Sequence, residues 1–273
     1  MRGTGALKLN FIFKFRFIRL QVPISVYENI NQGKYINQRL MCGRYSVVKK
    51  QVPKGHRYAA KFAGIEPEPN FNAAPSQSLP VIPNTSQHVE LFSWGLVPAW
   101  SRDSKGNKPI NARAETITTS PMFNRLIRNK RCLVPADSFY EWQVKPLVEN
   151  TLFGEAAMAG KGNTLKIPYR IMMKDEDLFS FAGLYDEWVD KSTGEMLRTF
   201  TIITTQANEV VQPIHDRMPV ILTPEAEELW LDEHEKEVLD LLKPYDASKM
   251  KAYRISNLVN SPLNKKAEII NPL

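Results

Sequence analysis

Cysteine is scarce in this chain: only two of its 273 residues are Cys. Two cysteines exclude a disulfide framework, so we expect a reducing compartment. No Cys/His cluster has the spacing of zinc ligands, and we expect neither a metal nor a cofactor. No run of about 18 apolar residues occurs, which excludes a membrane-spanning helix. The remaining composition, 43% hydrophobic, is typical of a globular protein that can build a large core.

The positive charge is concentrated at one end. The net charge is +7, yet residues 1–40 hold seven basic residues and one acidic residue. The remaining 233 residues carry 29 basic and 28 acidic groups, a net of only +1. Binding of DNA by this larger part must therefore rest on local patches, not on the overall charge.

Residues 1–40 also differ from the rest in pattern. Residues 11–20 alternate Phe with other residues, and three basic side chains interrupt the apolar core that a secretory signal needs. The shortage of acidic residues fits a transit peptide, but the helical periodicity is poor. We interpret this segment as an extension, either disordered or read into the gene upstream of Met41.

Short strand-like segments dominate from Met41 onward. They are bounded by Pro, Gly, Asn and Asp, and they lie at Tyr45–Val48, Leu79–Ile82, Val89–Trp94, Arg131–Pro135, Tyr169–Met173, Leu178–Tyr185, Phe200–Thr204 and Pro219–Leu222. Strands without regular βα alternation predict an α+β fold with a largely antiparallel, barrel-like sheet and few helices. We expect one domain over residues 41–273, with a surface insertion near residues 144–166.

Few helices are predicted. The pair Ser120–Pro121 has the signature of an N-cap and first turn, and it predicts a short helix over residues 120–130. Thr223–Pro224 repeats the signature. A third helix is predicted after Asp232, which has the signature of an N-cap with Glu235 three residues later, and Val238, Leu239, Leu241 and Leu242 would share one of its faces. Cys132 lies in an apolar strand and is expected to be buried and unreactive.

Four clusters place titratable or hydrogen-bonding residues at loops or strand ends, where sites are usually built. They are Met41–Tyr45 (MCGRY), Pro109–Thr116 (PINARAET), Ala136–Trp142 (ADSFYEW) and Ile214–Pro219 (IHDRMP). Each has a structural explanation when taken alone. The cysteine can be a small buried hydrophobe, the glutamate a surface ion-pair partner, and the histidine a satisfied core residue.

Together and in this order, the clusters resemble the SOS response-associated peptidase (SRAP) family. The resemblance runs from Met41 to about Pro272, and further stretches support it: Phe71–Pro75 (FNAAP), Trp94–Trp100 (WGLVPAW), Arg131–Asp137 (RCLVPAD) and Phe181–Leu184 (FAGL). It implies the SRAP fold and an activity on abasic sites in DNA. It also implies a catalytic cysteine at the mature N-terminus, which is Cys42 here. Translation must then start at Met41, or cleavage must free Cys42.

The same resemblance assigns the other site residues. The implied catalytic residues are Cys42, Asn111, Glu141 and His215, and the implied DNA-binding residues are Arg44, Asn72, Trp94, Trp100, Arg113 and Arg217. A carboxylate can take the proton of a terminal amine, and a histidine can move protons near neutral pH. An amide can hydrogen-bond the sugar, arginines suit phosphates, and tryptophans can stack on bases. Burial in the core is the alternative for both tryptophans.

An N-terminal cysteine suits the chemistry of an aldehyde. Its α-amine and thiol both titrate near pH 8, and they lie on adjacent carbons. Attack of the amine on an aldehyde gives an imine, and attack of the thiol on that imine closes a thiazolidine ring. An abasic site supplies the aldehyde when its deoxyribose opens. A cysteine inside a peptide lacks the free amine, so the extension matters.

The expected partner is single-stranded DNA that contains abasic sites, and the replication machinery is a further candidate. We expect a monomer inside the cell, in the cytoplasm or nucleoid of a bacterium or in the nucleus of a eukaryote. Two other functions stay open. One is a thiol peptidase or autopeptidase with Cys42 as the nucleophile and His215 as the base. The other is a noncatalytic reader of modified bases, which needs no thiol.

Overall fold

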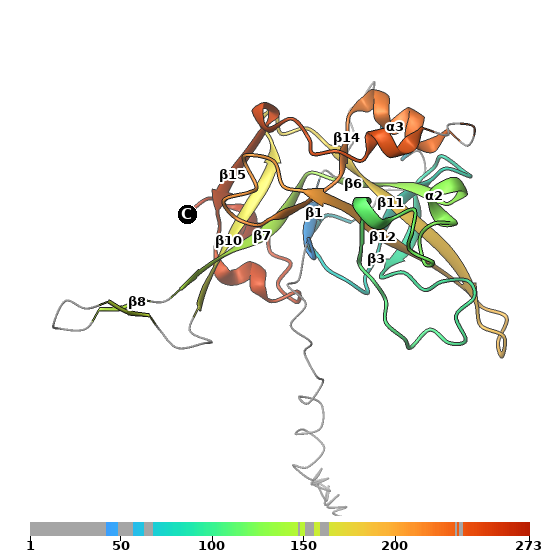
Figure 1. Cartoon of the computed structure of the whole chain (residues 1–273), viewed down its shortest axis with the longest axis horizontal. Coiled ribbons are helices and arrows are strands. Elements are labelled where there is room, and N and C mark those ends of the chain that lie inside the picture. The colour runs from blue at the N-terminus through green and yellow to red at the C-terminus, as the bar shows by residue number, and fades with distance from the viewer. Residues whose placement is uncertain are drawn as a thin grey trace, which may run out of the picture. The chain divides into compact units, whose positions relative to one another are not determined.

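Five strands of the computed structural model close into a barrel (Figure 1). They are β3 (Ser78–Pro83), β4 (Glu90–Trp94), β6 (Arg131–Ala136), β11 (Phe179–Val189) and β12 (Met196–Gln206). The pairing runs β12–β4–β3–β6–β11 and back to β12, and it is antiparallel except between β12 and β4. This closed sheet confirms the predicted α+β fold.

The structure describes residues 42–48, 57–62, 68–146, 148–150, 156–158, 164–232, 234 and 237–273. These residues belong to one compact unit, Leu40–Leu273. The predicted extension, residues 1–40, lies outside the described residues. In the part of the chain that is described, no helix has the length and apolar character needed to cross a membrane.

Large apolar side chains fill the barrel, among them Phe92, Trp94, Phe181 and Phe200. Alternation along each strand turns every second side chain inward, which explains why the aromatic residues of β4 and β11 lie two positions apart. Gly183 of β11 leaves room for its neighbours, because a Cβ there would lie 2.9 Å from Cys132 Sγ. Cys132 is fully buried, as predicted, and burial raises the pKa of its thiol.

Three short strands extend the barrel at one end. β5 (Asn111–Arg113) and β13 (Arg217–Pro219) both pair with β12, and β14 (Ile221–Leu222) pairs with β11. The register places Arg113 opposite Thr204, and Gln206 opposite Arg217. Two of the predicted site clusters, 100 residues apart in sequence, therefore meet at the carboxyl end of β12.

A second sheet has the order β15–β10–β7–β1–β2 and is antiparallel throughout. Its strands are β1 (Tyr45–Val47), β2 (Asn70–Ala73), β7 (Ser138–Pro146), β10 (Thr164–Met173) and β15 (Met250–Arg254). Tyr45 joins the two sheets, since its ring centroid lies 5.3 Å from that of Trp94 and 5.7 Å from that of Phe181. The residue three positions after Cys42 is thus fixed in the core.

The predicted insertion at residues 144–166 lies at the outer end of the β7–β10 hairpin, which Figure 1 shows reaching away from the barrel. Strand pairing extends into it, up to Pro146 opposite Thr164. Beyond, β8 (Val148–Asn150) pairs with β9 (Ala156–Met158). Its remaining residues, 147, 151–155 and 159–163, lie outside the described residues.

The helices in the described part of the chain are few and short. The Thr223 cap is confirmed: its side chain accepts a hydrogen bond from Ala226 N at the start of α3 (Pro224–Leu231). The helix predicted over 120–130 is wrong in extent, because mixed three- and four-residue turns lead into α2, which spans only Leu126–Asn129. The helix predicted after an Asp232 N-cap is wrong: Asp232 is the C-cap of α3, and the apolar residues form only the 3-10 turn η2 (Val238–Leu241), which ends shortly before Pro244.

Four further 3-10 turns lie in the described residues. They are η1 (Ala114–Thr116), η3 (Ala247–Lys249), η4 (Asn257–Asn260) and η5 (Ala267–Ile270). η1 directly follows β5, so it starts beside the end of β12 where the short strands meet.

Candidate functional site

The nitrogen of Cys42 is held by a buried carboxyl group. Cys42 N donates a hydrogen bond of 2.7 Å to Glu141 Oε1, and the two residues are 3% and 1% exposed. Strand pairing causes this contact. β1 pairs with β7, and Tyr140 N still bonds to Arg44 O before β1 begins, so the chain continues alongside β7 toward Glu141. The sequence prediction that Glu141 lies near the Cys42 nitrogen agrees with this geometry.

The electrostatics of this pair favour neutral groups. Burial raises the pKa of Glu141 to about 7, although hydrogen bonds from Cys42 work in the opposite direction. Burial and then the charge of Glu141 raise the pKa of the Cys42 thiol, while the nearby Arg217 guanidinium lowers it. At neutral pH in the uncleaved chain, Cys42 therefore keeps its thiol proton and Glu141 is poised between its two protonation states.

His215 lies in the turn before β13, and its ring is oriented by the backbone. His215 Nδ1 accepts a hydrogen bond of 3.1 Å from Arg217 N. Asp216 Oδ1 lies 3.2 Å from the same nitrogen, which would require a proton on Nδ1. We favour the backbone bond, because an N–H aimed at Nδ1 requires a lone pair there, and the Asp216 side chain is largely exposed. The neutral ring then carries its proton on Nε2.

Arg217 makes a bidentate pair with Glu115. Arg217 Nη1 lies 2.6 Å from Glu115 Oε1, and Nη2 lies 2.9 Å from Oε2. Nη2 also donates to the backbone oxygen of Thr204 at 2.7 Å and to its Oγ1 at 3.2 Å. Because this guanidinium is already engaged within the protein, its predicted contact with phosphate remains a prediction.

Asn111 begins β5 opposite Ile202 of β12, and its side-chain oxygen Oδ1 is buried. Trp94 fixes the start of this strand, since its Nε1 donates a 3.0 Å hydrogen bond to Ile110 O. The predicted stacking of Trp94 on DNA is wrong: the ring is 1% exposed and stacks against Phe200 inside the barrel.

Arg44 and Asn72 hold the C-terminal segment in place, a role that the sequence did not reveal. Arg44 donates to Asn72 Oδ1 at 2.7 Å and to the carbonyl oxygens of Val259 and Asn260. Asn72 Nδ2 donates to the same Val259 oxygen and to two more carbonyl oxygens, those of Ser261 and Asn264. Asn72 is fully buried, so the predicted contact with DNA is wrong for this residue. The Nη1 and Nη2 groups of Arg44 therefore already donate hydrogen bonds within the protein.

Two predicted DNA-binding residues do face solvent. Arg113 ends β5 and is exposed, and Trp100 is 66% exposed. The loop that carries Trp100 is pinned through its backbone: Ala99 N donates to Asp186 Oδ2 at 2.8 Å, and Trp188 Nε1 donates to Ser101 O at 2.9 Å. The indole is thus presented from a fixed loop.

Three residues that the sequence reasoning did not single out support the site: Glu115, Thr204 and Gln143. Glu115 and Thr204 bind Arg217, as described above. Gln143 lies two positions after Glu141 on β7, and its Nε2 donates a 2.8 Å hydrogen bond to Pro213 O. That bond ties the turn that carries His215 to the strand that carries Glu141. Glu115 lies inside one of the four clusters, which is the only signal that could have marked it.

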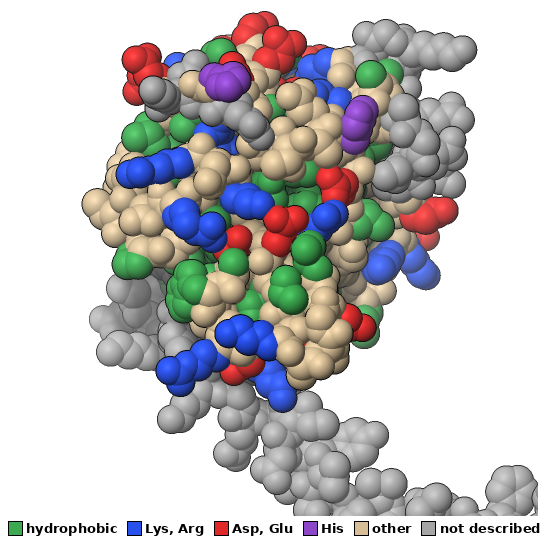
Figure 2. All heavy atoms as spheres, turned by 90° about the vertical axis from the view of Figure 1, so that its right-hand side faces the viewer, with side chains coloured by type: hydrophobic (Ala, Val, Ile, Leu, Met, Phe, Trp, Pro, Cys, Tyr) green, Lys and Arg blue, Asp and Glu red, His purple; other side chains and the backbone are tan. Residues whose placement is uncertain are grey.

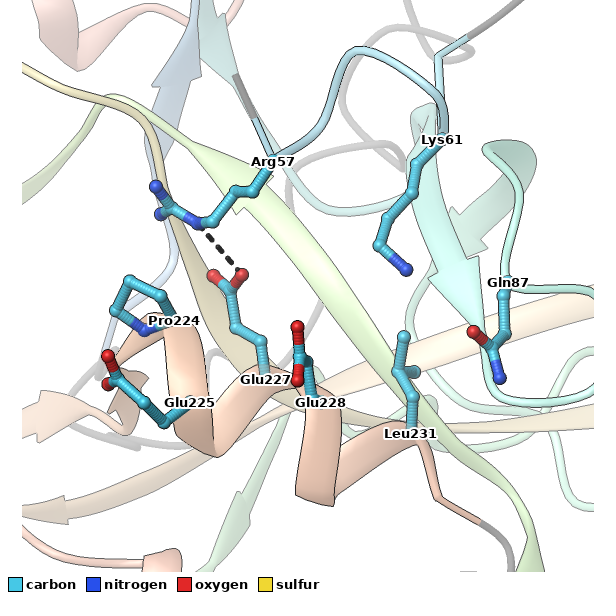
Figure 3. A pocket seen from close by; sticks show the side chains of 8 residues that line it. All are labelled: Arg57, Lys61, Gln87, Pro224, Glu225, Glu227, Glu228 and Leu231. Carbon is cyan, nitrogen blue, oxygen red and sulfur yellow. Dashed lines mark hydrogen bonds and ion pairs between the residues drawn. The ribbon is translucent and has the colours of Figure 1, made fainter. Parts of the chain in front are cut away.

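A separate hollow of about 430 Å³ lies along α3 (Figure 3). It is lined by Arg57, Lys61, Gln87, Pro224, Glu225, Glu227, Glu228 and Leu231, none of which belongs to the predicted site. Figure 3 shows Arg57 and Glu227 pointing toward one another, and their Nε–Oε2 distance is 3.0 Å. Glu227 also accepts a hydrogen bond from Tyr58, so this network fastens residues 57–62 to α3.

Charges of both signs are interspersed over the middle of the face drawn in Figure 2. Surface cations of the described residues often pair with acids, as in Lys130–Glu187 and Arg198–Glu90. This agrees with the nearly balanced charge beyond residue 40. Among the described residues, no three His, Cys, Asp or Glu side chains converge closely enough to hold a metal ion.

Comparisons with known proteins agree with these motifs. Residues 41–262 match the profile of the SOS response associated peptidase (SRAP) family. The abasic site processing protein YoqW of Bacillus subtilis is 43% identical over 84% of this chain and 99% of its own length. The abasic site processing protein HMCES of Gallus gallus is 33% identical over 75% of this chain and 66% of its own. A solved structure from Bacteroides thetaiotaomicron has 34% identity and a TM-score of 0.70, with 85% of this chain and all of that one covered.

Proposed function

Because the chain belongs to the SRAP family, we propose that it processes abasic sites in DNA, and that Cys42 traps them in single strands as a covalent adduct. The names of its relatives support the substrate. The observation that carries the mechanism is the 2.7 Å contact between Cys42 N and Glu141 Oε1. This contact supports the proposal because the Glu141 carboxyl group, which can act as a base, lies next to the nitrogen that must attack the aldehyde.

The reaction needs a free α-amine at Cys42. The Glu141 carboxylate accepts a proton from the terminal ammonium, and the neutral amine attacks the aldehyde carbon of the opened sugar. The carbinolamine loses water to give an imine. The Cys42 sulfur then attacks the imine carbon while its proton passes to the nitrogen, and the thiazolidine ring closes. In the uncleaved chain the same nitrogen is an amide, whose lone pair is delocalised into the carbonyl, so the adduct cannot form.

His215 supplies a hydrogen-bond donor for the sugar. Its Nδ1 accepts from Arg217 N, so the proton on Nε2 can be offered as a hydrogen bond to the sugar ring oxygen, which stabilises the negative charge that develops there as the ring opens. The Asn111 amide can hydrogen-bond the sugar without adding charge. These two roles follow from the chemistry of the groups and from the family resemblance.

The exposure of the side chains decides which of the predicted DNA contacts we propose. Of the three predicted arginines, we propose that Arg113 binds a flanking phosphate, because its side chain is exposed at the end of β5. Trp100 offers a face for an unpaired base, worth about 1–3 kcal/mol. We place this activity in the response to DNA damage, with single strands as the substrate, because a bare sugar reaches the buried cysteine most easily when no partner strand obstructs it.

The test uses protein that begins at Cys42 and a single-stranded oligonucleotide with one abasic site. An adduct that survives heating in SDS is expected, and Cys42→Ala should form none. Glu141→Gln and His215→Ala should slow its formation roughly 10²–10⁴-fold. The chain that begins at Met1 should stay unlinked unless its N-terminus is trimmed. If the trimmed wild-type protein leaves the damaged strand unlinked, the proposal fails. Equal binding by Cys42→Ala, with no adduct in either protein, would instead identify a noncatalytic reader.

Self-cleavage before Cys42 is a second candidate. Cys42 has a positive φ of 40°, a conformation that costs a non-glycine residue about 1 kcal/mol or more. Attack of Cys42 Sγ on the carbonyl carbon of Met41 would expel the Cys42 nitrogen as a free amine and leave a thioester, which water hydrolyses. Mass spectrometry of the purified N-terminus tests this. Cleavage in the wild type that is lost in Cys42→Ala supports it, and equal cleavage in both assigns the cut to another protease.

A further inference from the structure

We propose that Glu115 is a positioning residue that fixes the Arg217 guanidinium at the end of β12, two residues from His215. This inference deepens the proposed function, since the reaction it assists is the one assigned to Cys42. Glu115 belongs to η1, and Arg217 begins β13. The two elements lie 102 residues apart in sequence and meet because β5 and β13 both pair with the end of β12.

The geometry indicates that Glu115 sets the direction of the guanidinium. Two parallel hydrogen bonds, of 2.6 and 2.9 Å, join the carboxylate to both terminal nitrogens of Arg217. A bidentate pair of this kind fixes orientation as well as distance. Within the described residues, the one other residue that accepts hydrogen bonds from this side chain is Thr204, near the end of β12. Arg217 Nε is buried and makes no hydrogen bond to the described residues, so it gives no further anchor.

The burial of the two partners differs in a way that fits this role. The Arg217 side chain is 11% exposed, whereas that of Glu115 is 44% exposed. Glu115 is therefore the more exposed partner of this ion pair, and the Arg217 guanidinium is the more buried one. The charged groups that act on the Cys42 thiol are Glu141, Arg217 and Asp216, and only Arg217 favours the thiolate. Glu115 thus influences the thiol through the cation that it orients.

A DNA-free assay tests the inference separately from the proposed function. Protein that begins at Cys42 is treated with iodoacetamide between pH 7 and 9, and modification of the N-terminal peptide is followed by mass spectrometry. Glu115→Gln keeps one acceptor but loses the second charged bond, so Arg217 should turn away from the thiol more often. We expect alkylation at least about threefold slower, because partial loss of a favourable charge interaction of about half a pKa unit lowers the thiolate fraction about threefold.

A double-mutant cycle makes the test specific. Arg217→Met should slow alkylation as well, and Glu115→Gln should add nothing in that background, since its effect passes through Arg217. Glu115→Asp, with its charge kept on a shorter side chain, should recover part of the rate. Glu176→Gln is the matched control, because it breaks an exposed glutamate–lysine pair elsewhere, and it should react like the wild type. Thermal melts of each variant verify that it is folded.

Three results would overturn the inference. The first is a Glu115→Gln rate equal to that of the control. The second is an equal loss with and without Arg217. The third is an unchanged alkylation rate together with tighter binding of an oligonucleotide that carries a tetrahydrofuran abasic analogue, which would show that Glu115 competes with phosphate for Arg217. None of them depends on adduct formation, so a failure of the crosslinking proposal remains distinguishable.

Discussion

The buried carboxyl group of Glu141 gives the uncleaved chain a specific pH dependence of stability. Burial raises its pKa from 4.5 to about 7. In the unfolded chain the side chain is hydrated and keeps its ordinary pKa. Between these two values the folded chain holds a proton at Glu141 that the unfolded chain has lost. Stability falls with rising pH wherever the folded state binds more protons, so the free energy of unfolding decreases across this range.

The magnitude follows from the two pKa values. Each pH unit between them changes the free energy of unfolding by about 1.4 kcal/mol. Most of the range from pH 5 to pH 8 lies in this window, so Glu141 should contribute about 2–3 kcal/mol less to stability at pH 8 than at pH 5. Other titrating groups add their own pH dependence. The comparison with Glu141→Gln cancels them, because Gln cannot titrate and is nearly the same size.

Urea unfolding of both proteins at pH 5, 6, 7 and 8 measures this contribution. The chains must retain the Met41–Cys42 bond, and mass spectrometry checks that they do. We expect Glu141→Gln to gain on the wild type steadily up to about pH 7 and then to level off. The exposed variant Glu176→Gln should run parallel to the wild type. Wild-type and Glu141→Gln curves that stay parallel over the whole range would refute the assignment of a buried, proton-holding carboxyl.

Three other substitutions test separate parts of the structure. Arg113→Ala should weaken binding of a single strand with a tetrahydrofuran site and lower the slope of log Kd against log salt by about 0.7, as measured by fluorescence anisotropy. Gln143→Ala removes the bond to Pro213 O; unfolding should show a loss of about 1 kcal/mol, and adducts should form more slowly at unchanged affinity. Gly183→Ala should lower stability by about 1–3 kcal/mol in thermal melts, and adding Cys132→Ala should restore part of it.

Local patterns in the sequence predict part of the strands, and they miss other strands and the contacts that only the topology creates. Every predicted strand segment overlaps an observed strand, because apolar runs bounded by Pro, Gly and Asn carry that information. The strands β2, β5, β7 and β15 are missed. Of these, β5 (Asn111–Arg113) is too short and too polar to show a period. The place of β5 beside β12 decides where Asn111 and Glu115 lie, and no local pattern encodes a pairing of Asn111 with Ile202, more than 90 residues later.

Polar side chains illustrate a second limit. Arg44 and Arg113 look alike in the sequence, because each lies two positions after a predicted catalytic residue. The first bonds to carbonyl oxygens of Val259 and Asn260, and the second is exposed. Which of the two is available to a phosphate depends on acceptors that come from more than 200 residues away. The tryptophans differ in the same way, because Trp94 at the end of β4 packs on Phe200 in the core, whereas Trp100, in the loop that follows, is exposed.

In the proposed mechanism, removal of the residues before Cys42 changes the base as well as the nucleophile. In the uncleaved chain Glu141 accepts a hydrogen bond from an amide, and burial keeps the pKa of its carboxyl near 7. A terminal ammonium at the same position would stabilise the carboxylate and lower that pKa. In a buried site, however, an ion pair and its neutral counterpart lie close in energy, because desolvation offsets the attraction. The proton can therefore pass from nitrogen to Glu141 at little cost, which leaves a neutral amine ready to attack. The geometry that holds a peptide nitrogen in one form of the chain thus prepares a nucleophile in the other.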